Sequence, residues 1–365
     1  MLAGLRDAGF VGTVRLVGVE PELPYERPHL SKGYLLGTVP REKLPLRPAG
    51  QYAAELMLGE RAAEVDVERR EVRLASGGSV RWDVLCIATG SSARRLVGYE
   101  DALHLRELPD ADAMREVIDA RGELNIIGAG FIGCEVAAVA ARKGCRVRVH
   151  EALEQPLLRV LGPELGAYLA GVHRSHGVDL HLGVGALPAM EGRVLVAVGS
   201  APRTELAERA GLEVDRGIVV DELGRTSAPG VFAAGDVTRF HSPVYGTRIR
   251  VEHFQTAQRQ GYAAGRAMAG ETIPYDEVPW FWSDQYDLNL QYAGAGLLWD
   301  EVVVRGELGA PPFSIFQLAA GRLIAVAGVN DHHTVARARR LIQEQVEVSR
   351  DRLSDPRFDL RRALG

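Results

Sequence analysis

Three glycines and one carboxylate have the spacing that a nucleotide-binding site requires. Gly128, Gly130 and Gly133 form a G-x-G-x-x-G pattern directly after an apolar run, and Glu151 follows Gly128 by 23 residues. The glycines let a pyrophosphate approach the start of the next helix, where free N–H groups and the positive dipole end attract an anion. The Glu151 carboxylate accepts hydrogen bonds from ribose hydroxyls and repels a 2′-phosphate. The pattern therefore predicts binding of NADH rather than NADPH.

The segments around this pattern read as a strand–helix–strand unit. Residues 124–127 form an apolar strand, residues 131–143 an Ala-rich helix, and residues 146–150 a second strand. Other strand-like runs alternate with helical stretches, and one segment alternates in polarity as a hairpin does. The runs are 14–17, 84–88 and 194–198, and the hairpin is 61–82. We therefore predict an α/β fold with parallel sheets.

The pattern changes from about residue 274 to the alternation of an antiparallel sheet. The expected strands are 289–293, 301–306, 313–318 and 323–329, followed by an Arg-rich helix at 334–346. This part of the chain is predicted to be a separate α+β domain.

Composition limits the classes of function. The 365 residues carry 43 Lys and Arg against 48 Asp and Glu, a net charge of −5, and 46% of them are hydrophobic. This is a globular profile without the basic excess of a nucleic-acid-binding protein. Cys86, Cys134 and Cys145 form no C-x-x-C pair and lack zinc-ligand spacing, so neither thiol chemistry nor structural zinc is predicted. No apolar run reaches the roughly 18 residues of a membrane helix, and no signal segment opens the chain, so a cytoplasmic protein is expected.

Three further segments carry a resemblance to a known family. They are PYERPHLSKGYL at 24–35, TSAPGVFAAGDV at 226–237 and VPWFWSDQYD at 278–287. Together with the glycine pattern, they resemble the FAD-dependent NADH:ferredoxin reductases, a family that includes putidaredoxin reductase and the reductases of aromatic-ring dioxygenases and is related to apoptosis-inducing factor. The resemblance implies two Rossmann-like domains and a C-terminal α+β domain. It places FAD binding in 1–106 and 221–274, NAD binding in 107–220, and the C-terminal domain in 275–365.

The resemblance also implies the roles of two charged residues. Lys32 matches the family lysine beside the flavin ring, where a cation stabilises the reduced, anionic form. Glu135 matches the glutamate that pairs with this lysine near the nicotinamide, so we predict a Lys32–Glu135 ion pair. Taken alone, Lys32 would read as a solvated loop residue, and Glu135 as a carboxylate favoured by the start of a helix.

Other residues take cofactor roles from the same resemblance. Asp236 is expected to bind the ribityl chain of FAD, although an aspartate here also suits a helix N-cap. Trp282 is expected to close the nicotinamide pocket, although simple core packing would also suit an aromatic residue. The remaining FAD contacts are Glu20, Arg27, Ala62, Arg106, His253 and Phe254, and the remaining NAD contacts are Phe131, Ile132 and Gly199.

The cysteine content separates branches of such flavoenzymes. Disulfide reductases need a redox-active cysteine pair, which this sequence lacks, so electrons are expected to leave the flavin directly. A flavin accepts electrons in pairs from NADH and releases them singly, as an iron–sulfur carrier requires. The predicted partner is a small [2Fe–2S] ferredoxin that serves an oxygenase system. Its acidic surface would dock on an arginine rim, with Arg94, Arg95, Arg248 and Arg250 as candidates.

The sequence departs from the family in two places. Relatives begin with a strand and a further Gly-rich loop before the helix that here starts at Met1, so we expect the natural protein to start upstream. Val19 also stands where relatives often carry an acid, which leaves Glu20 for the ribose of FAD. The second departure lies between Leu180 and Val194, where relatives carry a longer antiparallel meander. A meander is peripheral, so the NAD-binding fold is expected to survive its loss.

Two alternative functions remain open from the sequence. One is an NADH-responsive flavoprotein with a sensing role, and the other is a degraded relative that cannot hold FAD. The sequence is compatible with either a monomer or a homodimer.

Overall fold

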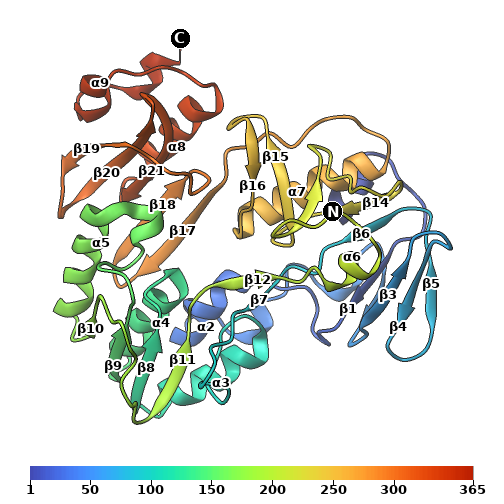
Figure 1. Ribbon diagram of the computed structural model, residues 1–365, viewed down its shortest axis with the longest axis horizontal. Coiled ribbons are helices and arrows are strands. Elements are labelled where there is room, and N and C mark those ends of the chain that lie inside the picture. Colours follow the sequence, from blue (N-terminus) through green and yellow to red (C-terminus); the bar gives the residue numbers. More distant parts are fainter. Residues whose placement is uncertain (365) are drawn as a thin grey trace. The chain divides into compact units, whose positions relative to one another are not determined.

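The computed structural model describes residues 1–364 and divides into two compact units. Unit 1 consists of Met1–Glu26, Pro45–Ser92 and Pro202–Pro279. Unit 2 consists of Arg27–Leu44, Ala93–Ala201 and the chain from Trp280 onward. The chain crosses between the units in β7 (Ser91–Ala93) and again in β12 (Ser200–Pro202). The strands and helices confirm the predicted α/β class (Figure 1), whereas the expected division into four segments stays a prediction.

The glycine pattern directly follows a strand of a four-stranded parallel sheet in unit 2. Its order is β10-β9-β8-β11, formed by β8 (Glu123–Ile127), β9 (Arg146–His150), β10 (Asp179–His181) and β11 (Arg193–Val196). Helices α4 (Phe131–Arg142) and α5 (Leu158–Ser175) connect the strands. The first confirms the predicted helix at 131–143, whereas the second was not predicted from the sequence. The described chain forms no strand between β10 and β11. The NAD-type sheet is therefore intact without the longer meander.

The second sheet of unit 2 is antiparallel, as predicted, with the order β17-β18-β21-β20-β19. Its strands are β17 (Trp280–Gln285), β18 (Leu288–Ala293), β19 (Glu301–Glu307), β20 (Ala310–Ala319) and β21 (Arg322–Val329). Helix α8 (His332–Gln343) packs against β21 and β18 and buries Val335, Ala338 and Leu341. This sheet positions Trp282 and the residues that follow it.

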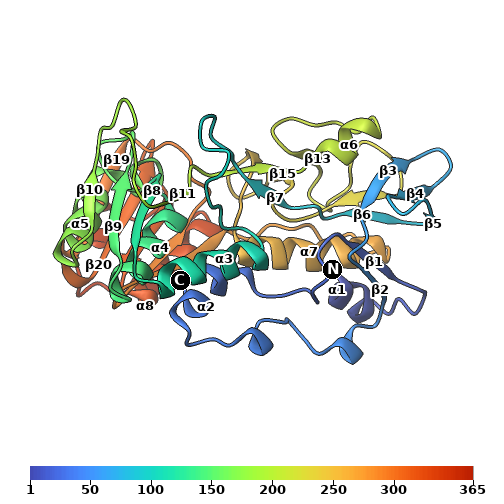
Figure 2. The same ribbon diagram turned by 90° about the horizontal axis from the view of Figure 1, so that it is seen from below.

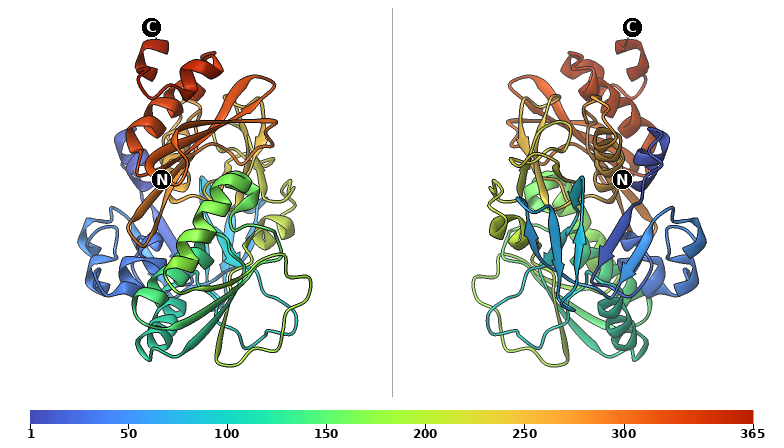
Figure 3. Two further views of the ribbon diagram at one scale, coloured as in Figure 1. Left: turned by 90° about the vertical axis from the view of Figure 1, so that its left-hand side faces the viewer. Right: turned by 90° about the vertical axis from the view of Figure 1, so that its right-hand side faces the viewer.

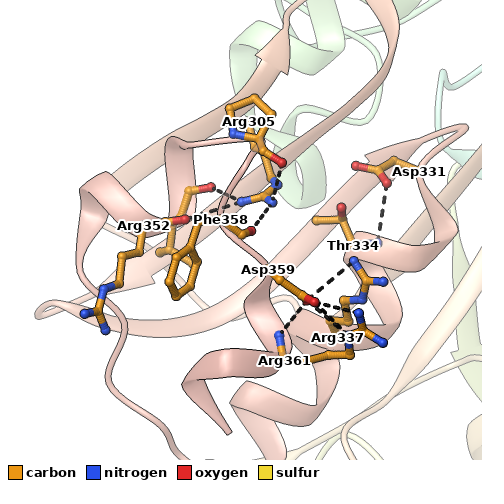
Figure 4. Close-up of polar contacts among 10 residues, drawn as sticks. Arg305, Asp331, Thr334, Arg337, Arg352, Phe358, Asp359 and Arg361 are labelled. Carbon is orange, nitrogen blue, oxygen red and sulfur yellow. Dashed lines mark hydrogen bonds and ion pairs between the residues drawn. The ribbon is translucent and has the colours of Figure 1, made fainter.

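Arg305 ties the C-terminal segment to this sheet (Figure 4). Arg305 of β19 is 7% exposed, and its guanidinium donates to four backbone carbonyls in and after α9 (Arg350–Ser354). The acceptors are the carbonyls of Arg352, Leu353, Pro356 and Phe358, at 3.3, 3.1, 3.2 and 2.6 Å. Beyond them, Asp359 is the N-cap of η4 (Leu360–Ala363) and pairs with Arg361 at 2.6 Å.

Short helices complete unit 2 around the motif at 24–35. They are η1 (Arg27–Ser31), α2 (Gly33–Leu36), η2 (Arg41–Lys43) and α3 (Leu108–Asp119). Asp112 of α3 accepts from the Tyr34 hydroxyl and pairs with Arg41 at 2.7 Å. These contacts hold the segment that carries Lys32 against α3.

Unit 1 contains small sheets and two helices that pack closely. The parallel pairs are β1 (Arg15–Gly18) with β2 (Glu55–Leu58), and β6 (Leu85–Ile87) with β14 (Val231–Ala233). Helix α1 (Leu2–Asp7) lies on α7 (Phe254–Met268) (Figure 2). A Cβ at Gly4 would clash with the Tyr262 carbonyl oxygen, so glycine permits this approach.

One antiparallel sheet and one mixed sheet, in which β13 and β15 are parallel, form the rest of unit 1. The predicted hairpin is the sheet β3 (Ala62–Asp66), β4 (Glu71–Leu74) and β5 (Ser79–Arg81) (Figure 3, right). The other sheet contains β13 (Ile218–Val220), β15 (Thr238–Ser242) and β16 (Thr247–Ile249), and the short helices are η3 (Ala49–Gln51) and α6 (Glu205–Arg209). In the described chain no strand joins the pair β1–β2 to the pair β6–β14. The expected upstream strand stays a prediction.

Among residues 1–364, none of the helices has both the length and the apolar character of a membrane span.

Candidate active site

The centre of the candidate site in unit 2 is a buried ion pair. Lys32 Nζ lies 2.7 Å from Glu135 Oε2, and the two side chains are 14% and 2% exposed. This confirms the Lys32–Glu135 pair predicted from the resemblance. Lys32 lies between η1 and α2, whereas Glu135 lies in α4, which packs against both η1 and β17. The tertiary fold thus brings the two charges together across about a hundred residues of sequence.

Two hydroxyl groups complete the surroundings of the Glu135 carboxylate. Ser31 donates to Oε2, and Ser283 of β17 donates to Oε1 at 2.7 Å. Both serines are buried. Buried charges need this kind of compensation, because an unpaired carboxylate away from water is strongly disfavoured. Reasoning from sequence missed both serines, although each lies inside a quoted segment and Ser31 directly precedes Lys32.

The glycine pattern forms a tight backbone cradle next to the start of α4. Gly128 has φ of 101°, and a Cβ there would come within 2.5 Å of the Ala197 carbonyl oxygen. A Cβ at Gly133 would clash with the carbonyl oxygen of Gly128. Gly130 is the N-cap of α4 and supplies no side-chain hydrogen bond to it. The first N–H groups of α4 therefore remain available to an anion, which fits a dinucleotide pyrophosphate.

Glu151 lies beside this cradle. Its Oε2 accepts from the Ala129 N–H at 2.6 Å and its Oε1 from the Leu153 N–H at 2.9 Å. Each carboxylate oxygen has a second lone pair, so both can still accept from ribose hydroxyls. The residues present thus fit the adenosine side of NADH.

The other predicted NAD contacts lie on the same elements. Phe131 opens α4 and meets Phe281 edge-on, with ring centroids 4.6 Å apart, while Ile132 beside it is 40% exposed. Gly199 follows β11 with φ of 98°. Trp282 lies in β17, where its ring centroid is 6.0 Å from that of Trp280. The structure therefore places these four residues in unit 2 with the glycine cradle.

The residues predicted to bind FAD divide between the units. In unit 1, Glu20 follows β1 and accepts from the Tyr25 hydroxyl at 2.5 Å. Asp236 follows β14, is 9% exposed, and accepts from the Ser91 hydroxyl at 3.3 Å. Both carboxylates thus lie just beyond the carboxyl ends of parallel strands, the edge at which α/β sheets bind ligands. Ala62 begins β3 in the same unit.

The remaining FAD candidates belong to two pairs. In unit 1, His253 is the N-cap of α7 and Phe254 is its first residue. Burial lowers the pKa of His253 to about 4, so the imidazole is neutral at neutral pH. In unit 2, Arg27 donates to the carbonyl oxygen of Arg106 at 2.8 Å, so these two predicted residues are in contact.

The cysteines do not support thiol chemistry. All three are free thiols. Burial raises the pKa of Cys86 to about 11, and burial together with the charge of Glu135 raises that of Cys134. A thiol that keeps its proton is a poor nucleophile, so a dithiol mechanism has no support in this chain.

These features define a class of protein. The dinucleotide cradle, the carboxylate beside it and the buried lysine–glutamate pair are those of a nicotinamide- and flavin-dependent oxidoreductase. Residues 3–261 match the family described as pyridine nucleotide-disulphide oxidoreductase, and residues 280–364 match the family described as reductase C-terminal. The chain belongs to the pyridine nucleotide-disulphide oxidoreductase family. It is thus an enzyme, and membership implies FAD and NAD(H) as its cofactors.

Individual relatives make the comparison more specific. The chain is 36% identical to rhodocoxin reductase of Rhodococcus erythropolis over 99% of this chain and 90% of that protein. It is 34% identical to putidaredoxin reductase of Pseudomonas putida over 99% and 93%. A crystal structure of the covalent putidaredoxin reductase–putidaredoxin complex matches with a TM-score of 0.94 at 33% identity, over 99% of this chain and 94% of that chain.

Proposed function

We propose that this chain carries electrons from NADH through FAD to a small [2Fe–2S] ferredoxin that serves an oxygenase system. The observation that carries the proposal is the buried Lys32–Glu135 pair at 2.7 Å, in which Glu135 belongs to the helix that begins at the glycine cradle. Relatives support it, because they include the ferredoxin reductase components of the anthranilate and p-cumate dioxygenase systems. Neither the sensing role nor a relative unable to hold FAD is favoured by these comparisons.

FAD, when bound, supplies the step that accepts electrons in pairs and releases them singly. Lys32 supplies a fixed positive charge for a cofactor that becomes negative on reduction, and Glu135 holds that charge in place. Gly128, Gly130 and Gly133 receive the pyrophosphate of NADH with Phe131 and Ile132, and Glu151 selects its ribose. Gly199 and Trp282 are assigned to the nicotinamide side.

The FAD contacts of each unit are assigned in the same way. Glu20 is assigned to the ribose, Ala62 to the adenine and Asp236 to the ribityl chain, with His253 and Phe254 at the flavin. In unit 2, Arg27 and Arg106 are assigned to FAD with Lys32.

Exposed arginines are the candidates for docking the ferredoxin. Arg94 and Arg95 are exposed, and Arg248 is 3.9 Å from Glu213. Arg250 instead pairs with Glu252 at 2.6 Å, which neutralises its charge. Arg94 and Arg95 are therefore better suited to attract an acidic partner than Arg248 and Arg250, each of which pairs with a glutamate. A cytoplasmic location agrees with three free thiols, because oxidising compartments favour disulfides.

Stopped-flow mixing of the FAD-loaded protein with NADH tests the proposal. Flavin absorbance is expected to fall, and an added [2Fe–2S] ferredoxin is expected to be reduced in turn. Lys32→Met should slow flavin reduction by about a hundredfold or more, the scale of one lost electrostatic contact to a developing charge. Lys43→Met removes an exposed lysine of η2 and serves as the control. Unchanged flavin reduction in Lys32→Met, or no transfer to ferredoxin, would refute the assignment.

A further inference from the structure

A chain of buried hydrogen bonds continues behind Glu135, away from Lys32. Ser283, which donates to Glu135, receives a hydrogen bond from Gln285 Nε2 at 3.2 Å. Gln285 Oε1 lies 3.1 Å from Nε2 of His173 in α5. His173 Nδ1 lies 2.9 Å from the Tyr286 hydroxyl. All the residues that form this series of hydrogen bonds belong to unit 2.

The chemistry of each group fixes the direction of the whole chain. The Ser283 hydroxyl has one hydrogen, which it donates in the hydrogen bond to Glu135. Its oxygen therefore accepts the hydrogen bond from the Gln285 amide. The Gln285 carbonyl can only accept, and this requires a proton on Nε2 of His173. Nδ1 of the same neutral ring then has no hydrogen, so it accepts a hydrogen bond from the Tyr286 hydroxyl. All four donors therefore point toward the Glu135 carboxylate.

Burial keeps His173 and Tyr286 in the protonation states that this direction of hydrogen bonding requires. Ser283, Gln285 and His173 are 0%, 1% and 2% exposed. Burial lowers the pKa of His173 to about 4, against the hydrogen bond to Gln285 and in the same direction as the nearby charge of His176. Burial also raises the pKa of Tyr286, with a contribution from Cys134, so the phenol keeps its proton. The ring of His173 is thus neutral and the phenol is a donor, as the direction requires.

Tyr286 occupies an unusual position for a tyrosine. It lies between β17 and β18 with φ of 57°, in the left-handed region that favours glycine and asparagine. Its ring stacks on His176 with centroids 3.7 Å apart and planes inclined by 13°. The side chain thus has specific partners that a glycine would forgo.

We propose that His173 is a positioning residue for the Lys32–Glu135 pair. Through Gln285 and Ser283, it orients a hydroxyl proton onto Glu135 Oε1, which leaves Oε2 to face Lys32 and Ser31. The carboxylate is then held from both sides and cannot rotate away from the lysine. The proposal rests on the proposed function of Lys32 in flavin reduction for its effect on rate, but the proton arrangement itself does not.

The first test observes the proton arrangement directly. In protein labelled with ¹⁵N-histidine, NMR at neutral pH should show His173 with its proton on Nε2 and a bare Nδ1, assigned by the loss of those signals in His173→Gln. Gln285→Leu should remove the fixed preference for this tautomer. A His173 protonated on Nδ1, or charged at neutral pH, would overturn the proposal whatever the function of Lys32.

The second test measures the consequence in the FAD-loaded enzyme. His173→Leu should slow flavin reduction at saturating NADH by roughly tenfold, since small misplacements of a charged group cost rate steeply. His173→Gln restores an N–H donor toward Gln285 and should recover most of the rate. Equal losses in the two variants would assign His173 a merely structural role and reject the proposal.

Milder variants keep the test valid if His173→Leu fails to fold. Tyr286→Phe removes only the first donor of the chain, and Tyr168→Phe removes a hydroxyl from the same helix as His173 but outside the chain. Tyr286→Phe should weaken the tautomer preference and slow flavin reduction more than Tyr168→Phe does. Identical behaviour of the two would contradict the proposal. A normal tautomer preference combined with an unaffected rate in Lys32→Met would instead reject the proposed function.

Discussion

Replacement of Glu135 by glutamine should destabilise unit 2 strongly. The amide keeps the size of the side chain, but it removes the charge that faces Lys32 Nζ at 2.7 Å in a site where the carboxylate is 2% exposed. Two hydroxyl donors, Ser31 and Ser283, also converge on this group. Breaking one partner of a buried pair costs about 3–5 kcal/mol, because the other charge is left uncompensated.

Urea unfolding followed by tryptophan fluorescence measures this loss. Of the four tryptophans, Trp280, Trp282 and Trp299 belong to unit 2, so the signal reports mainly on that unit. The matched control is Asp119→Asn, which breaks the Lys143–Asp119 pair of the same unit, where the aspartate is 50% exposed. The control should lose no more than about 1 kcal/mol. Equal midpoints for Glu135→Gln and Asp119→Asn would refute the reasoning from burial.

Three further perturbations have outcomes that the structure sets. The pKa of His173 is about 4 in the folded protein and near 6.5 in the unfolded protein. Between pH 4 and 6.5 the unfolded protein therefore binds more protons, so the free energy of unfolding falls as the pH drops from 6.5 to 4. The loss should approach about 3 kcal/mol in urea titrations and shrink in His173→Gln, and a pH-independent midpoint would contradict it. Glu151→Ala should weaken NADH binding about tenfold and NADPH binding less, as measured by titration; equal losses would contradict its role at the ribose. Arg305→Met should leave four carbonyls without their donor and lower the free energy of unfolding by about 2–4 kcal/mol. Limited proteolysis should then cleave the segment after Ser349 faster than in the wild type. Cleavage at the wild-type rate would show that other contacts hold the segment.

Local patterns were sufficient to predict the elements with clear periodicity, but not the 18-residue helix α5. The strand at 146–150 was predicted to the residue, because its apolar positions are bounded by Gly144 and by the acidic Glu151. The hairpin at 61–82 was found from alternating polarity and the Ser-Gly-Gly-Ser turn. The strand expected at 313–318 extends to Ala310–Ala319, because its ends pair with β19 and β21 and such pairing is not visible in one strand alone.

Residues of the candidate site could be predicted only where they match a motif position whose role is known in the family. Lys32 and Glu135 were paired through the resemblance, and the structure confirms the contact. Ser31, Ser283 and His173 were missed because their contacts depend on segments more than a hundred residues apart in sequence. A buried serine or histidine has no distinctive local pattern, so its partner becomes visible only once the chain is folded.

Helix α4 gives the enzyme a rigid connection between cofactor binding and charge. Its N-cap, Gly130, and Glu135 are five residues apart on one helix, which is about 7.5 Å along its axis. Any movement of the amino end of α4 would also move the Glu135 carboxylate, because the residues between them are helical. The place where the pyrophosphate is assigned and the Glu135 carboxylate are thus connected by helical backbone alone, without a loop or a hinge between them.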